Sequence, residues 1–257
     1  MAEAGLAAGK ADGGVRSIAR AVDVLQLFDL DHPRRTLREI VALTGLPKTT
    51  VVRVLATLGA LGLIVDQRDS TYGPGAGFLR WVDLARSLWD VDADARRIMA
   101  RLVDACGETV NVYIRQDLSR ISIAQVEGTA TVRSVVRVGA PYTLETGAAA
   151  KVLLGGAPES VLRQLSERPG RDPDTLRREV TAVSEAGYAV SHGERELGAS
   201  AVAAPILSPD GRVLAALSVG GPTSRFTADR VRRYVDAVTE SATEIGSIGL
   251  GRVEAFL

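Results

Sequence analysis

Residues 36–75, TLREIVALTGLPKTTVVRVLATLGALGLIVDQRDSTYGPG, decide the fold of the first part of this 257-residue chain. Thr36 is followed three residues later by Glu39, which is the pattern of a capping box, so we expect a helix to begin at Thr36. Apolar residues then recur at helical spacing, and Gly45 stands where a left-handed residue commonly ends a helix. The pattern predicts one short helix followed by a turn at residues 44–46.

A second helix is predicted to begin at about Pro47, because the missing N–H of proline costs nothing at the first position of a helix. We expect it to end at Gly59 or Gly62. One of its faces is apolar, and the opposite face is small and cationic. The apolar face carries Val51, Val54, Leu55 and Leu58, and the cationic face carries Lys48, Thr49, Val52, Arg53 and Ala56. No acidic residue occurs from position 47 to position 65.

A β-hairpin is predicted after this helix, with strands at residues 63–65 and 71–73 and a polar tip at residues 66–70. Upstream, Ser17 is expected to cap a further helix. The inward residues of that helix are predicted to be Ile18, Ala21, Val22 and Leu25. Three helices and a hairpin in this order predict a winged helix-turn-helix domain over residues 15–77, a fold that places one helix in the major groove of DNA.

The predicted partner of this domain is double-stranded DNA. A helix that enters the groove needs short side chains, cations for phosphates or guanine edges, and hydroxyls for phosphates. The alternative is a small helical domain whose exposed cations are ordinary solvated charge. We expect Arg53 to read a base and Arg68, on the hairpin, to contact phosphate. The full set of DNA-binding candidates is Arg16, Arg20, Thr36, Lys48, Thr49, Thr50, Arg53 and Arg68.

The overall composition gives no hint of DNA binding, because 31 Lys and Arg residues balance 31 Asp and Glu residues. The length and the 46% hydrophobic content predict two domains. Residues 1–14 are rich in Gly and Ala and are predicted to form a disordered tail. The single Cys excludes an internal disulfide, and no apolar run approaches 18 residues. We therefore expect a cytoplasmic protein with no membrane partner.

Catalysis, a metal and a cofactor are not expected. The chain has two histidines, His32 and His192, and lacks a Cys pair and an HExxH motif. His192, Glu194 and Ser200 could be imagined as a hydrolase constellation, but no G-x-S-x-G elbow is present, and the sequence ties no nucleophile to a base. Buried Cys106 is predicted to be an inert thiol rather than a redox switch.

A linker helix is predicted at residues 78–90, after several Gly and Pro residues. One side of this helix is apolar, and it carries Phe78, Trp81, Leu84, Ala85 and Leu88. The small DNA-binding domain offers little surface to cover such a stripe. A partner subunit is the expected cover, and the chain's own second domain is the alternative.

The second domain is predicted to occupy residues 91–257. A helix ending at Gly107 is followed by alternating apolar and polar residues, which predict strands. Helices then intervene before further strands and a final helix, so we expect an α+β fold, an antiparallel sheet with flanking helices. The predicted strands are 108–114, 121–126, 132–138, 188–191, 200–207 and 213–219, and the predicted helices are 148–154, 158–165, 175–186 and 227–245.

At this point the chain resembles the IclR family of bacterial transcription regulators, from about Val15 to Ile248. The stretches that carry the resemblance are 46–58 (LPKTTVVRVLATL), 187–190 (GYAV), 203–206 (AAPI) and 215–222 (AALSVGGP), together with Gly193, Glu194 and Gly198. The resemblance implies a GAF-like effector-binding fold for the second domain and a dimer or a dimer of dimers. It also implies regulation of a palindromic operator by a small organic molecule, with repression as the default sign.

Pockets in this family lie between the sheet and the loop before the helix that contains Lys151. Carried over to this chain, the resemblance gives the effector-binding candidates Tyr142, Ala148, Ala149, Ser191, Ala201, Ser218 and Gly220. The alternative for each small residue is plain packing of helix on sheet. Ala150 stands where a Gly is usual and Gly220 where a second Ser is frequent, so we expect a more apolar effector or a roomier cavity.

Exposed backbone N–H groups at the start of the Gly147 helix could still hold a carboxylate. The expected effector is therefore an aromatic or aliphatic acid, or its amide. The competing hypothesis is an effector-independent, architectural DNA-binding protein whose large domain only forms oligomers.

Overall fold

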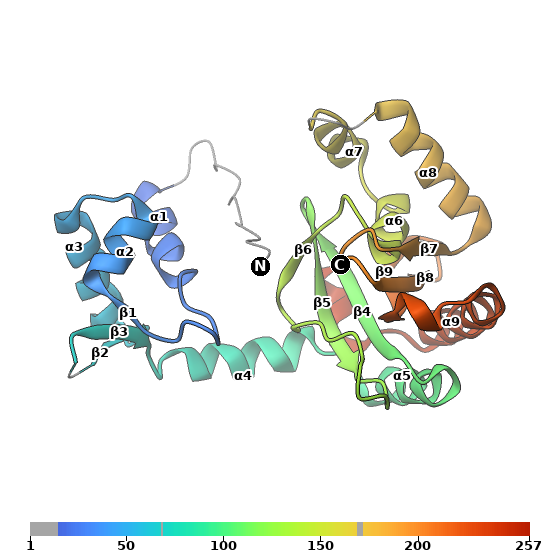
Figure 1. Ribbon diagram of the computed structural model, residues 1–257, viewed down its shortest axis with the longest axis horizontal. Helices are drawn as coiled ribbons and strands as arrows, with labels where there is room; N and C mark the ends of the chain where they lie inside the picture. The colour runs from blue at the N-terminus through green and yellow to red at the C-terminus, as the bar shows by residue number, and fades with distance from the viewer. Residues whose placement is uncertain (1–14, 68, 169–171) are drawn as a thin grey trace. The chain divides into compact units, whose positions relative to one another are not determined.

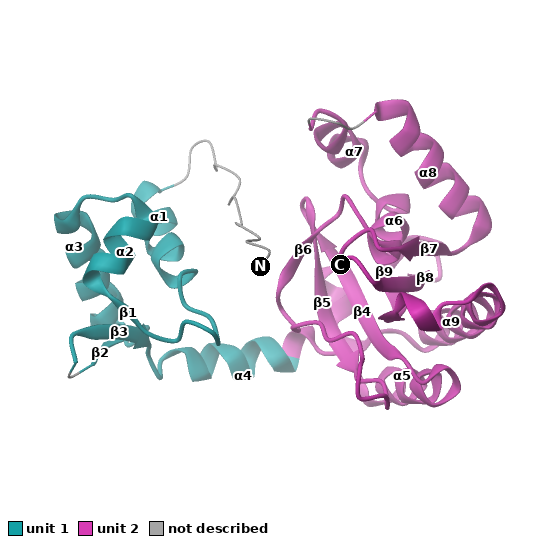
Figure 2. Cartoon of the chain, viewed as in Figure 1, with its two compact units in different colours: residues 1–87 teal, residues 88–257 magenta. Residues whose placement is uncertain are grey.

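A computed structural model describes residues 15–67, 69–168 and 172–257, so the predicted tail at residues 1–14 and the candidate Arg68 lie outside the described residues. The chain divides into two compact units (Figures 1 and 2). The first unit ends at Ser87, and the second runs from Leu88 to Leu257. Each unit is described by itself.

The first unit is a winged helix-turn-helix, as predicted. Three helices stand beside a small antiparallel sheet with strand order β1-β3-β2 (Figure 1). The helices are α1 (Arg16–Leu25), α2 (Leu37–Thr44) and α3 (Lys48–Ala60), and the strands are β1 (Arg35–Thr36), β2 (Ile64–Asp66) and β3 (Thr71–Pro74). The helix α4 (Phe78–Trp89) follows the wing.

The predicted capping box fixes the start of α2. The backbone N–H of Thr36 donates to Oε2 of Glu39 over 2.7 Å, and the backbone N–H of Glu39 donates to Oγ1 of Thr36 over 3.3 Å. Gly45 follows the helix with a φ of 65°, in the left-handed region that glycine enters without steric cost. Purely local chemistry therefore sets both ends of α2.

The helix α1 differs from the prediction at its start and in its buried face. Val15 is the N-cap residue, so Ser17 lies inside the helix and caps nothing. Ile18 is 62% exposed and Val22 is 42% exposed, whereas Val24 is fully buried. The buried stripe is formed by Ala21, Val24 and Leu25, which pack with α2 and α3. The predicted apolar stripe therefore faced the wrong side of the helix. It included Ile18 and Val22, which are exposed, and left out Val24, which is buried.

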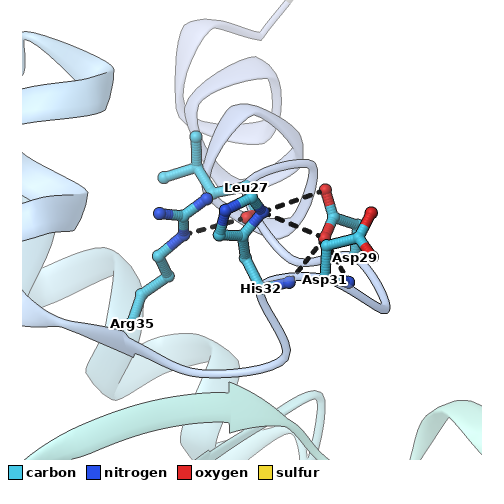
Figure 3. A network of polar contacts seen from close by, with 5 residues as sticks. All are labelled: Leu27, Asp29, Asp31, His32 and Arg35. Carbon is cyan, nitrogen blue, oxygen red and sulfur yellow. Dashed lines mark hydrogen bonds and ion pairs between the residues drawn. The ribbon is translucent and has the colours of Figure 1, made fainter. Parts of the chain in front are cut away.

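The loop between α1 and β1 is organised by one carboxylate (Figure 3). Oδ1 of Asp29 accepts hydrogen bonds from the backbone N–H groups of Asp31 and His32, over 2.8 and 2.6 Å, and lies 3.2 Å from Nδ1 of His32. Nε of Arg35 donates to the carbonyl oxygen of Leu27 over 3.3 Å. The backbone N–H of His32 lowers the pKa of Asp29, so the stabilisation is present at neutral pH and is lost as the pH falls through that lowered pKa.

Three glycines hold the wing close to the end of α3. A Cβ on Gly75 would lie 2.2 Å from the carbonyl oxygen of Gly62, and a Cβ on Gly77 would lie 2.7 Å from the same atom. Both distances are shorter than any contact a real Cβ makes. The backbone N–H of Gly77 donates to that carbonyl over 3.0 Å. Side chains are therefore excluded at both positions.

The apolar side of α4 is not covered by the first unit, to which this helix belongs up to Ser87. Trp81 is 56% exposed and Leu84 is 48% exposed, and none of the residues of α4 is buried. Trp89, at its end, packs instead on Phe256 with the ring centroids 5.2 Å apart. Among the described residues, no single helix is long and apolar enough to cross a membrane, and α2 with α3 meets that criterion only as a pair bent by 115°.

The second unit confirms the predicted α+β fold. It contains a six-stranded antiparallel sheet of order β6-β5-β4-β9-β8-β7. The strands are β4 (Thr109–Gln116), β5 (Ser119–Val126), β6 (Pro141–Thr143), β7 (Ala189–His192), β8 (Ala199–Leu207) and β9 (Val213–Pro222). The helices are α5 (Ala93–Cys106), α6 (Ala148–Gly155), α7 (Glu159–Ser166), α8 (Pro173–Ala186) and α9 (Ala228–Ile248), with the short 3₁₀ helices η1 (Thr223–Arg225) and η2 (Gly251–Phe256).

The two faces of this sheet have different partners. The apolar face packs on α5 and α9 and contains Val110, Val112 and Leu217. The opposite face packs on α6, which in turn packs on α8, and α8 contacts α7. Because side chains alternate along a strand, Asn111 and Tyr113 point to this second face. Asn111 pairs with Ser218 in the register of β4 and β9, so polar side chains from neighbouring strands meet there.

The predicted strand at residues 132–138 is not formed. Burial does not alternate by two along this segment: Val132, Val135 and Val138 are exposed, and Val136 is buried. Its backbone is held by single contacts instead, since the N–H of Val136 donates to the side chain of Gln125 over 2.8 Å. The third strand of the meander is the shorter β6, so residues 127–140 form a loop at this edge of the sheet.

Candidate functional site

The outer face of α3 is exposed and cationic, as the sequence predicted. Lys48, Thr49 and Arg53 are exposed, and Thr50 is half-buried. Val51, Leu55 and Leu58 are buried on the other side of the helix. Within the part of the chain that the structure describes, no ion pair involves Lys48 or Arg53. Their charges are therefore available to an external anion such as a phosphate.

The remaining DNA-binding candidates lie on other elements. Arg16 is exposed and Arg20 is half-buried, both on α1. Oγ1 of Thr36 donates to Oε2 of Glu39 over 2.8 Å, so this hydroxyl hydrogen is already used by the capping box. Arg34 was missed by the sequence analysis: it is exposed and lies 3.6 Å from Asp69 at the tip of the wing. Only proximity in the fold could have identified it.

A cavity lies in the second unit, between the polar face of the sheet and the start of α6. Its volume is about 40 Å³. The structure brings six of the seven effector candidates into its wall, namely Ala148, Ala149, Ser191, Ala201, Ser218 and Gly220. The other lining residues are Asn111, Tyr113, Arg120, Ser134, Gly147, Arg195, Ala199 and Ser200. The seventh candidate, Tyr142, is not part of the wall.

Tyr142 contacts the cavity indirectly through two arginines. The guanidinium carbons of Arg120 and Arg195 each lie 5.9 Å from the centre of its ring. Arg120 also lies 5.7 Å from the ring centre of Tyr113. Such distances allow cation–π attraction, which holds both arginines in place.

Two N–H groups at the start of α6 are already bound within the chain, so fewer of them are free than we expected. The N–H of Gly147 donates to Oε2 of Glu194 over 2.9 Å, and the N–H of Ala148 donates to Oγ of Ser191 over 3.0 Å. Nζ of Lys151 lies 2.6 Å from Oε1 of Glu194. The chain therefore supplies its own carboxylate at this helix terminus, where the partial positive charge favours an anion.

The cavity is more polar and smaller than the sequence indicated. Arg120 and Arg195 both line it, and neither was among the candidates. Arg120 is only 3% exposed. Burial, with a smaller contribution from the nearby charge of Arg195, lowers the pKa of Arg120 to about 10. The available signal was an Arg in a strand that is otherwise uncharged, on the same face as Tyr113.

A Ser–His pair adjoins the cavity, which corrects the expectation that no nucleophile is tied to a base. Nδ1 of His192 lies 2.9 Å from Oγ of Ser200, which lies 2.8 Å from Oγ1 of Thr223. The carboxylate of Glu194 is bound by the N–H of Gly147 and by Lys151, and among the described residues it forms no hydrogen bond or ion pair with His192. Among the described residues, no group of three or more His, Cys, Asp and Glu side chains could hold a metal ion.

Residues 17–68 match the IclR helix-turn-helix domain, and residues 85–247 match the bacterial transcriptional regulator IclR C-terminal domain. The chain belongs to the IclR family. It is therefore a DNA-binding transcriptional regulator. The relatives of this IclR protein are regulators rather than enzymes, which agrees with the expectation that it catalyses no reaction.

Relatives of this IclR protein match over nearly the whole chain. The HTH-type transcriptional regulator KipR of Bacillus subtilis is 32% identical, over 90% of this chain and 95% of its own length. A crystal structure of an IclR-family regulator from Rhodococcus sp. is 46% identical with a TM-score of 0.63, over 95% of this chain and 97% of that one. An IclR homologue of Microbacterium hydrocarbonoxydans, crystallised with 4-hydroxybenzoate, is 25% identical with a TM-score of 0.72, over 93% and 99%.

A second cavity of this IclR protein has a volume of about 510 Å³ and contains its single cysteine. Cys106 lies at the end of α5, and burial raises the pKa of its thiol to about 11, with the charge of Glu108 adding to the effect. A pKa raised on folding means that the neutral thiol favours the folded state at pH values below about 9, and this stabilisation is lost as the pH rises towards 11.

We expect Cys106 to react slowly with iodoacetamide at pH 8, because roughly one thiol in a thousand is then ionised. The rate in the native protein should be at least about 50-fold below the rate of the same chain unfolded in urea. It should rise with pH up to about 11. Equal rates for the native and unfolded chains would mean that Cys106 is a reactive thiol.

Proposed function

We propose that this chain is a repressor whose operator affinity changes when a small organic acid or amide occupies the cavity beside α6. The cavity is the observation that carries the effector part of the proposal, because six residues chosen by resemblance converge on it. A structural neighbour crystallised with 4-hydroxybenzoate supports the same chemical class. Repression is the sign that the family resemblance implies.

We further propose that the chain binds a palindromic operator as a dimer or a dimer of dimers. The uncovered apolar side of α4, with Trp81 and Leu84 exposed, supports a partner subunit as its cover. A twofold oligomer would present two α3 helices to two half-sites about one helical turn apart. The proposed DNA-binding residues are those of the α3 face, Lys48, Thr49, Thr50 and Arg53, together with Arg16, Arg20, Thr36 and Arg68.

The experiment that tests this function is selection of bound duplexes from a random-sequence library at two salt concentrations. Contacts with phosphates weaken steeply as salt rises, whereas base reading persists. A palindromic site that survives the higher salt would support the proposal. Binding that disappears with salt would contradict sequence-specific regulation.

The selected operator then tests the effector. Its affinity is measured with 4-hydroxybenzoate, simple aliphatic acids and their amides. An effector coupled to DNA binding should change operator affinity by about 5–150-fold, which corresponds to roughly 1–3 kcal/mol, and the operator should change effector affinity by the same factor. Constant affinity with every compound would favour the effector-independent alternative, in which the large domain only forms oligomers.

A further inference from the structure

The guanidinium of Arg120 has one occupied edge and one free edge. Nη1 donates to the carbonyl oxygens of Thr143 and Thr146, the latter over 2.8 Å. Nε is buried and has no hydrogen-bond partner among the described residues. Nη2 lies on the same edge of the guanidinium as Nε. It is close to Gly147, because a Cβ built on that glycine would lie 3.4 Å from Nη2. Arg120 and Gly147 both line the cavity, so the edge formed by Nε and Nη2 lies beside the start of α6.

The charges around this edge do not balance. Arg195 adds a second guanidinium to the cavity wall, and its ion-pair partner Glu196 is 3.8 Å away and 73% exposed. Glu194 is the nearby carboxylate, but its two oxygens are bound by the N–H of Gly147 and by Lys151. A buried donor without a partner costs free energy, and more so when it is charged. An anion in the cavity would satisfy Arg120.

We propose that Arg120 selects the chemical class of the effector by binding its carboxylate with Nε and Nη2. This inference rests on the proposed function, in which the cavity is the effector site. A carboxylate offers two acceptor oxygens in the plane that matches one edge of a guanidinium. An amide offers one acceptor and places donor hydrogens against the other nitrogen. The effector is therefore a small carboxylate and not the corresponding amide.

The cavity also limits the size of what enters without rearrangement. A water needs roughly 10–15 Å³ of such space, so about 40 Å³ accommodates a group the size of a carboxylate. A larger acid requires movement of a wall residue. Arg195 is the wall side chain most able to move, since it is 27% exposed and lies in the loop between β7 and β8.

Titration of the full-length protein with formate, followed by the ¹⁵N NMR resonance of the Arg120 Nε–H, tests the proposal. Formate is small enough for the cavity, and formamide is its neutral counterpart. We expect formate to shift this resonance with saturation and formamide to leave it in place. Sodium chloride at the same ionic strength should also leave it in place. Absence of a formate effect up to about 100 mM, or an equal effect of formamide, would overturn the proposal.

Two variants test the contribution of the Arg120 guanidinium to anion binding. Arg120→Lys keeps the charge but loses the two-nitrogen edge, so formate affinity should fall at least about tenfold. Arg115→Lys is the matched control, because Arg115 pairs with Arg120 across β4 and β5 and does not line the cavity. It should bind formate as the parent does. If Arg120→Lys fails to fold, the titration of the parent protein with its two probes still decides.

Failure of the carboxylate site and failure of the proposed function can be told apart, because the formate titration is done without DNA. If an acid that changes operator affinity acts unchanged on Arg120→Lys, the role of Arg120 is refuted and the proposed function stands. If formate binds at Arg120 while no acid changes operator affinity, the carboxylate site stands and the effector-sensitive regulator does not.

Discussion

Replacing Arg225 with Ala should destabilise the second unit by about 3 kcal/mol, because it leaves a buried carboxylate without its partner. Glu108 is only 1% exposed. Nε and Nη2 of Arg225 donate to its two oxygens over 2.5 and 2.6 Å, and Nη2 also donates to the carbonyl oxygen of Val132 over 3.0 Å. The lower end of the usual 3–5 kcal/mol range applies, since the Arg225 side chain is 27% exposed and water can replace part of it.

The measurement is urea denaturation of the full chain, with the transition of the second unit fitted separately. Arg232→Ala is the matched control, because its ion pair with Asp229 is 72% and 79% exposed and should contribute less than about 1 kcal/mol. Adding Glu108→Gln to Arg225→Ala removes the buried charge and should restore part of the loss. A loss from Arg225→Ala no larger than that from Arg232→Ala would show that Glu108 needs no partner.

Replacing Arg53 with Ala should weaken operator binding by about 1–3 kcal/mol and relax the preference for one base pair. Arg53 is exposed on the outer face of α3, opposite the buried Leu55 and Leu58. A guanidinium that reads guanine with two nitrogens loses both hydrogen bonds and specificity when it is removed. The test compares affinities for the selected operator and for each single-base variant of it.

Three variants distinguish base reading from attraction to phosphates. Arg53→Lys keeps the charge without the two-nitrogen geometry, so it should lose specificity almost as Arg53→Ala does. Lys48→Ala should weaken binding to all DNA sequences to a similar extent. It should also reduce the slope of log affinity against log salt concentration by about one, as expected for one lost phosphate contact. The same uniform loss is expected for Arg68→Ala, at a position outside the described residues. Equal, sequence-independent losses for Arg53→Ala and Lys48→Ala would refute base reading by Arg53.

The sequence predicted well those features that depend on neighbouring residues. The capping box of Thr36 and Glu39 and the left-handed Gly45 are local, so the ends of α2 could be derived without the rest of the chain. The alternation of Val110 and Val112 with Asn111 likewise assigned the two faces of β4. Residues 132–138 carry four valines, a residue type that favours strands, yet their burial does not alternate as the two faces of a sheet require.

The candidate cavity could be predicted in part, and its missing residues share a physical cause. Small residues such as Ala148 and Ser218 lie in stretches that resemble the family, whereas Arg120 meets the cavity only because β5 pairs with β4. The ion pair of Glu108 and Arg225, which lies outside this cavity, could not be predicted either, because the two residues are 117 positions apart. The binding of Glu194 to the start of α6 also joins distant segments, so this contact could not be predicted from the sequence.

The contact of Gly75 and Gly77 with the carbonyl of Gly62 has a consequence for hybrid regulators. In this contact, backbone lies against backbone where no side chain can fit, so the end of α3 and the base of the wing are one inseparable piece. A DNA-binding domain transplanted onto another effector domain should therefore be cut after Gly77. A splice between Gly62 and Gly75 would take the end of α3 from one protein and the base of the wing from another, and their backbones would no longer fit against each other. The hybrid would then lose the shape of its wing even if every DNA-contacting side chain were kept.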